Sequence, residues 1–198
     1  IIGYEAFNYN ANPNYTRSLG WGIEPTQHTG LLASYQINDI VSVAAGVAET
    51  AGATINDRPW YHPGGVGPGG IANDGNFTKD QWNLAYMGAV AVTAPEDMGA
   101  LAGSTLDGGV VYGRNTQSGG SGNQTSWYAG ATVATPVEGL SVGAAFDYLD
   151  FQQSMTTSGS TWVGGLYASY QATEKLSLHA RGEYPRMNSG FALGALSA

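Results

Sequence analysis

The chain has 198 residues, of which only 11% are charged, and its net charge is −8. A water-soluble domain usually carries about twice that charged fraction, so we expect much of the surface to face something other than water. The acidic balance argues against nucleic acid, whose phosphates need a basic face. The chain has no cysteine, which excludes disulfides and thiolate metal sites. No apolar run reaches the roughly 18 residues of a membrane helix, so a closed β-barrel is the remaining way to span a membrane.

Residues 1–28 do not alternate between apolar and polar, and they contain Pro13 and Pro25. We expect this stretch to be an irregular lead-in or a constriction segment. The chain starts without Met, and residues 185–198 read as the start of a further strand. The expectation is therefore one β-barrel domain over residues 1–198, present as an interior piece of a longer chain.

Residues 29–184 are predicted to form four β-hairpins in an all-β, antiparallel, up-and-down barrel. The stretch "GLLASYQINDIVSVAAGV" at 30–47 recurs as "GLYASYQATEKLSLHARG" at 165–182. Pairing Tyr35 with Val43 places the apolar residues of both strands on one face. The stretch 127–148 behaves in the same way across a turn at 136–139. In the hairpin over 82–114 the alternation shifts near Ser104, and we expect a β-bulge there.

The connections predict which ends of the strands share a rim. Turns of three to six residues near Asn38, Pro95, Pro136 and Thr173 alternate with long polar segments at 49–80, 114–124 and 150–160. Short turns at one rim and long loops at the other are typical of an outer-membrane barrel. Aromatic side chains near both rims are predicted to lie at the lipid interface: Tyr35, Trp82, Tyr112, Trp127, Tyr148, Trp162 and Tyr170.

The residues that alternate with the apolar ones, on the other face of the strands, are polar residues interspersed with Gly and Ala. If the apolar face contacts lipid, this other face must point inward. The pore-lining candidates are His179, Arg181, Glu183, Asp147, Tyr128, Tyr167 and Asn83. A charged cluster at positions 179–183 would tune ion selectivity or form a rigid ion pair, and the sequence leaves both readings open.

The first thirty residues carry the motifs of a known family. These are G-Y-E at 3–5, N-P-N-Y-T-R-S at 12–18 and E-P-T-Q-H-T-G at 24–30. Together they resemble the OmpL-like β-barrel porins of Gram-negative outer membranes, and "LSLHARGEY" at 176–184 resembles them too. The positions that match the family motifs are Tyr4, Glu5, Asn12, Tyr15, Arg17, Glu24 and His28. The resemblance implies a barrel of more than eight strands and passive diffusion of small solutes.

The predicted function is therefore an outer-membrane porin-like channel for small polar solutes or ions, with membrane lipid as the main partner. A second copy of the chain, in a homo-oligomer, is a further candidate partner. The alternative is a secreted β-sandwich or filament-forming, adhesive protein that uses exposed aromatics. No nucleophile motif is present, so no enzyme, catalytic residue or cofactor is predicted. His62 lies near Asp57 and Asp74 but has no second His or Cys at ligand spacing, and no metal site is predicted.

Overall fold

The computed structural model describes residues 2–52, 84–114, 123–152 and 158–188. They form one antiparallel sheet of eight strands in chain order. The strands are β1 (Gly30–Gln36), β2 (Val41–Ala48), β3 (Ala85–Thr93), β4 (Thr105–Arg114), β5 (Asn123–Ala134), β6 (Leu140–Gln152), β7 (Ser158–Thr173) and β8 (Leu176–Asn188). Two short 3-10 helices, η1 (Tyr9–Ala11) and η2 (Glu96–Leu101), complete the described elements. The all-β, up-and-down architecture predicted from the sequence is confirmed.

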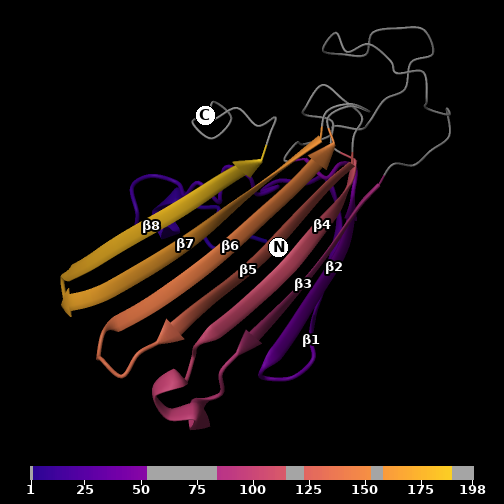
Figure 1. Cartoon of the computed structure of the whole chain (residues 1–198). Helices are drawn as coiled ribbons and strands as arrows, with labels where there is room; N and C mark the ends of the chain where they lie inside the picture. Colours follow the sequence, from indigo (N-terminus) through magenta and orange to yellow (C-terminus); the bar gives the residue numbers. More distant parts are fainter. Residues whose placement is uncertain (1, 53–83, 115–122, 153–157, 189–198) are drawn as a thin grey trace, which may run out of the picture.

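The sheet curves, and every strand pairs only with its neighbours in the chain (Figure 1). Strands β1 and β8 are its two edges, and within the described residues they do not pair with each other. The sheet is thus an open part of a barrel wall.

The hairpin registers follow the alternation of side chains. Tyr35 pairs with Val43 in β1–β2, as predicted, and Val133 pairs with Val142 in β5–β6. In β7–β8 the ladder is regular from Ser160–Asn188 to Gln171–Ser177 and then shifts between Gln171 and Thr173. Side chains repeat every two residues along a strand, so a polar turn fixes which residues share a face.

The β3–β4 hairpin differs from the prediction. Its ladder runs without a shift from Tyr86–Tyr112 to Thr93–Thr105, so the predicted bulge near Ser104 is wrong. The change of phase falls instead outside the sheet, in the connection that contains η2. This connection, between Thr93 and Thr105, is longer than the short turn expected near Pro95.

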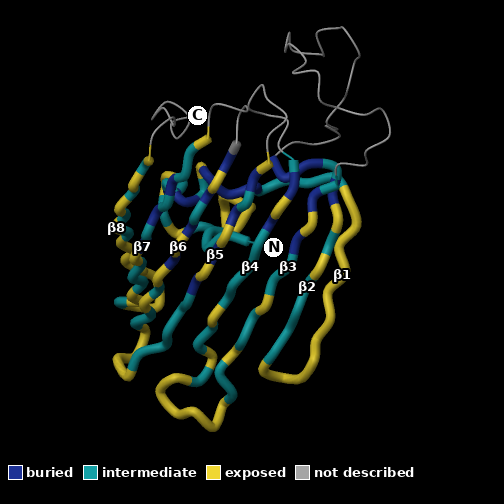
Figure 2. Tube along the Cα trace, turned by 45° about the vertical axis from the view of Figure 1, so that its right-hand side comes forward, coloured by how far each residue is buried: buried dark blue, intermediate teal, exposed yellow. Residues whose placement is uncertain are grey.

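Residues 2–29 lie on the concave face of the sheet. Figure 2 shows this N-terminal segment crossing behind the strands near the rim from which the long connections leave. The buried residues gather along this crossing, whereas the ends of the strands at the short turns are largely exposed (Figure 2). The core of the described structure is therefore the contact between the segment and the inner side of the wall.

Candidate pore interior

The two faces of the sheet differ in what covers them. The outward face, which contains Tyr35, Val90 and Phe146, carries large apolar side chains that no described residue covers, and these three are 70%, 44% and 44% exposed. The other exposed members include Leu31, Leu106, Tyr112, Trp127, Val142, Leu166, Leu178 and Tyr184. A face of this kind is expected to contact lipid. The opposite phase contacts the N-terminal segment and is the inner face.

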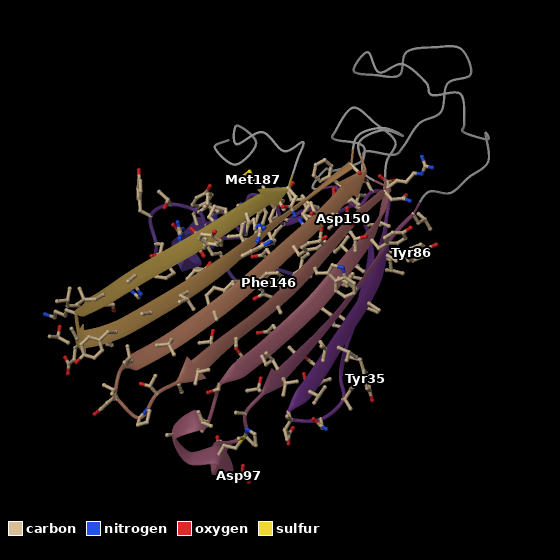
Figure 3. All side chains as sticks on the ribbon, in the orientation of Figure 1. Tyr35, Tyr86, Asp97, Phe146, Asp150 and Met187 are labelled. Carbon is tan, nitrogen blue, oxygen red and sulfur yellow. The ribbon has the colours of Figure 1, made fainter. Side chains whose placement is uncertain are left out.

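Aromatic side chains of the outer face lie toward both ends of the strands. Figure 3 shows Tyr35 at the end with the short turns and Tyr86 at the opposite end, with Phe146 on the wall between the two rims. Trp127 pairs with Tyr148, which pairs in turn with Trp162. The Trp162 ring also lies 5.7 Å from the rings of Phe146 and Tyr184. Tyr112 and Tyr170 are exposed on the same face, and Trp82 lies outside the described residues.

Tyr4 seats the start of the segment on the wall. Its ring stacks on Tyr167 of β7 at 4.1 Å, and its hydroxyl is hydrogen-bonded to the Thr132 hydroxyl of β5 at 3.0 Å. The hydroxyl lies over Gly143 of β6, where a Cβ would collide with it. Only glycine leaves room for the ring at this position. Thr132 of β5, Gly143 of β6 and Tyr167 of β7 therefore form one binding site for the Tyr4 side chain.

Glu5 is the centre of an ion-pair network. Arg181 of β8 donates from Nη1 to Glu5 Oε1 at 2.8 Å, and its Nε lies 2.9 Å from Glu183 Oε2. Arg181 also donates to the backbone oxygens of Thr16 and Arg17. The Leu19 amide donates to Glu183 Oε1 at 2.6 Å. The side chains of Arg181, Glu5 and Glu183 are 12%, 4% and 10% exposed, so the network lies under the segment.

Arg17 holds the segment in a loop. Its guanidinium donates to the carbonyls of Ala6 and Phe7, both at 2.6 Å. It lies 4.0 Å from the Tyr9 ring and 3.9 Å from the Trp21 ring, between two aromatic faces. Asn12 also donates to the Ala6 carbonyl, and Tyr15 at the tip of the loop is fully exposed. The loop keeps its shape through its own contacts.

A second buried contact involves Glu24. Ile23 packs with Leu149, Phe151 and Val163 of β6 and β7. The adjacent Glu24 carboxyl is hydrogen-bonded to Asp147 of β6. Burial, and after it the Asp147 carboxyl, raises the pKa of Glu24 to about 9. This environment therefore favours the protonated form of Glu24.

The two ends of the segment lie together at the β1 side of the wall. Ile2 contacts a cluster of Ala48, Ala85, Met87 and Val111. Next to it lies a cavity of about 220 Å³, which Ile2, His28 and Met87 help to line. Burial lowers the pKa of His28, partly offset by a hydrogen bond with the backbone of Ala51. A neutral imidazole is therefore favoured in this position.

The inner face remains open toward the short turns. Ser34, Gln36, Ser177 and His179 are exposed there, on the inner phase of β1 and β8. The His179 Nδ1 is hydrogen-bonded to Ser169 Oγ of the neighbouring strand at 2.9 Å. Hydroxyl, amide and imidazole groups therefore cover this part of the wall.

The pore-lining candidates divide into two groups. Arg181, Glu183 and Tyr167 contact the segment directly, and Asp147 and Tyr128 are buried beneath it at 5% and 7% exposure. His179 faces the open part of the inner wall. Asn83 and His62 lie outside the described residues. The sequence did not single out Thr132 or Leu19, and it treated Gly143 only as an inward-facing position that would tolerate a larger side chain. No local pattern predicts the contacts of these three residues between the segment and the wall.

The described part of the chain contains no group of three or more His, Cys, Asp or Glu residues arranged for a metal ion. It also contains no helix long and apolar enough to cross a membrane.

The comparison with family models agrees with this geometry. The model of the family described as "Putative beta-barrel porin-2, OmpL-like" matches residues 1–197. The chain belongs to this family. The OmpL-like porins are β-barrels of the bacterial outer membrane, so the strands described above are transmembrane strands and the exposed apolar face is surrounded by lipid. No curated protein and no solved structure matches the chain.

Proposed function

We propose that this OmpL-like porin is a passive channel for small polar solutes or ions and that residues 2–29 narrow it from inside. The observation that carries the proposal is the division of the inner face. One part is covered by the N-terminal segment, and the part toward the short turns is open and polar. A plugged barrel would be filled along its whole length, whereas a pore with a constriction is filled at one level.

The composition of the open wall supports passage of hydrated solutes. Ser34, Gln36, Ser169 and His179 offer hydroxyl, amide and imidazole groups that replace hydrogen bonds to water. The buried acids of the inner face are engaged with the segment and its arginine contacts. Passive transport without chemistry is the simplest activity for such a wall.

The segment is anchored strongly enough to act as a fixed constriction. Its contacts reach β5, β6, β7 and β8 through Thr132, Asp147, Tyr167 and Arg181. Charge-assisted hydrogen bonds in a partly desolvated setting are stronger than neutral ones. A segment held at several points narrows the lumen without closing it.

Liposome swelling tests the proposal. Vesicles that contain the protein should swell in isotonic solutions of small sugars, and the rate should fall as the sugar becomes larger. Vesicles with heat-denatured protein are the control. Equal swelling in both preparations, with the protein shown to be inserted, would refute the channel.

A further inference from the structure

Two carboxyl groups meet where the segment packs against β6. Glu24 of the segment and Asp147 of β6 are 7% and 5% exposed, and they are hydrogen-bonded to each other. Glu24 Oε2 and Asp147 Oδ1 have no hydrogen-bond partner among the described residues. Gly3 and Gly20 pack directly against these carboxyl groups, so the pair is enclosed by backbone.

No cationic side chain among the described residues compensates the pair, and the amino-terminal group of the chain acts on Glu24 more weakly than the neighbouring acids do. The charged side chains that face the pair are Glu5, which acts on Glu24, and Glu183, which acts on Asp147, and the phenol of Tyr128 lies nearby on β5. Arg181 forms ion pairs with Glu5 and Glu183. Arg17 forms an ion pair with Glu5 and donates hydrogen bonds to backbone carbonyls. The described side chains around the pair are therefore acidic or neutral.

Two buried carboxylates in contact cannot both be ionised, because their repulsion is not screened by water. A hydrogen bond between two carboxyl groups needs one proton, which is the simplest compensating charge. A calcium ion would need six to eight oxygen ligands, and the described residues supply no group of three acidic or histidine side chains here. A proton fits the site, whereas a metal ion lacks ligands.

We propose that Glu24 and Asp147 form a binding site for one shared proton, which fastens residues 18–24 of the segment to β6 and is lost when the pH rises. The direction follows from linkage. The pKa of Glu24 is raised from 4.5 to about 9 in the seated segment, so the seated state binds more protons than the released state between these values. The segment is therefore held on β6 most firmly near pH 4.5, and its attachment weakens as the pH rises toward about 9. This site does not depend on whether the barrel conducts.

Infrared spectroscopy detects the proton directly. At pH 6 the protein should show the carbonyl band of a buried, protonated carboxyl group, and the band should disappear in Glu24→Gln. Raising the pH above about 9 should remove the band from the wild type. A pair that shows no such band at pH 6 overturns the proposal.

Thiol labelling measures the release of the segment. The chain has no cysteine, so Ser18→Cys introduces a single reporter at a position that is 6% exposed. Tyr15→Cys, at a fully exposed position of the same segment, corrects for the pH dependence of the reagent. The ratio of the two labelling rates should rise steadily between pH 6 and pH 9, by up to about tenfold for each pH unit, because the seated state holds one more proton than the released state in this range.

The same ratio should stay constant in Glu24→Gln, because the glutamine amide donates a hydrogen bond to Asp147 at every pH. Asp147→Asn serves as the second variant if Glu24→Gln does not fold. An unchanged rise of the ratio in both variants overturns the proposal. A ratio at pH 6 that increases when a chelator is added also overturns it, since the pair would then hold a metal ion.

Discussion

Arg181 of β8 donates a hydrogen bond of 2.8 Å to Glu5, which lies 176 positions earlier in the chain. Through this contact the last described strand of the sheet holds the segment that precedes the first. The same guanidinium reaches the Thr16 and Arg17 carbonyls, so one side chain fixes two parts of the segment. Most of the following predictions concern this inner layer.

Arg181→Ala should release the segment from β8. The change leaves Glu5 and Glu183 buried beside each other without a cation, and removing one partner of a buried pair costs about 3–5 kcal/mol. Urea unfolding in detergent should show this loss, together with faster proteolysis within residues 6–20. Arg186→Ala, at an exposed position of the same strand, is the matched control and should change neither quantity. Equal effects of the two variants would contradict the network.

Gly143→Ala should displace Tyr4, because the new Cβ would occupy the place of the Tyr4 hydroxyl. Overpacking of this kind costs about 1–3 kcal/mol. Gly182→Ala in β8 is the control, since nothing lies within 4 Å of a Cβ there. Thermal unfolding should separate the two variants, and Gly143→Ala combined with Tyr4→Ala should recover part of the loss. If Gly143→Ala were as stable as Gly182→Ala, Tyr4 would not occupy this binding site.

Val90→Arg should place a charge in the lipid. Val90 lies on the outer face of β3 and is 44% exposed, and an arginine near the middle of a barrel strand costs about 2–4 kcal/mol. Ala91→Arg should cost much less, because residue 91 faces inward and pairs with Asp107. Folding of both variants into lipid vesicles measures the difference. If Ala91→Arg cost more than Val90→Arg, residue 91 and not residue 90 would face the lipid.

The stability of the segment should fall at acidic pH through His28. Its pKa lies below the usual 6.5 when the segment is seated, so the released state binds more protons as the pH falls through that value. Stability is therefore fully present above about pH 6.5 and decreases below it. Because Glu24 contributes with the opposite sign in this range, the trend is measured in Glu24→Gln, where melting temperatures should fall from pH 7 to pH 5, and by less when His28→Gln is added. A parallel trend in both proteins would assign it to other groups.

The wall was largely predictable from the sequence because strand register depends on local alternation. The pairs Tyr35–Val43 and Val133–Val142 follow from counting residues across a polar turn. The predicted bulge in the β3–β4 hairpin was wrong for two reasons. Gly108 and Gly109 have no side chains that would indicate a face, and Leu101 and Ala102 have an apolar pattern typical of a strand although they lie outside the sheet.

The inner layer was much less predictable. The sequence singled out Glu5, Arg17, Glu24 and Arg181 as motif or inward-facing positions, but nothing local joins Glu5 to Arg181 or Glu24 to Asp147. Such contacts depend on where an irregular segment folds back, and that path has no periodicity. Gly143 illustrates the difficulty, because its role is to leave space for a ring from another part of the chain.

Single-channel recording in planar lipid bilayers tests the central claim, a passive pore narrowed by its own N-terminal segment. We expect discrete conductance steps for the wild type that scale with the salt concentration, and larger steps for Arg181→Ala because the segment is no longer held against β8. Arg186→Ala should match the wild type. An inserted wild-type protein that passes no current, or an Arg181→Ala variant with unchanged steps and a released segment, would contradict the account.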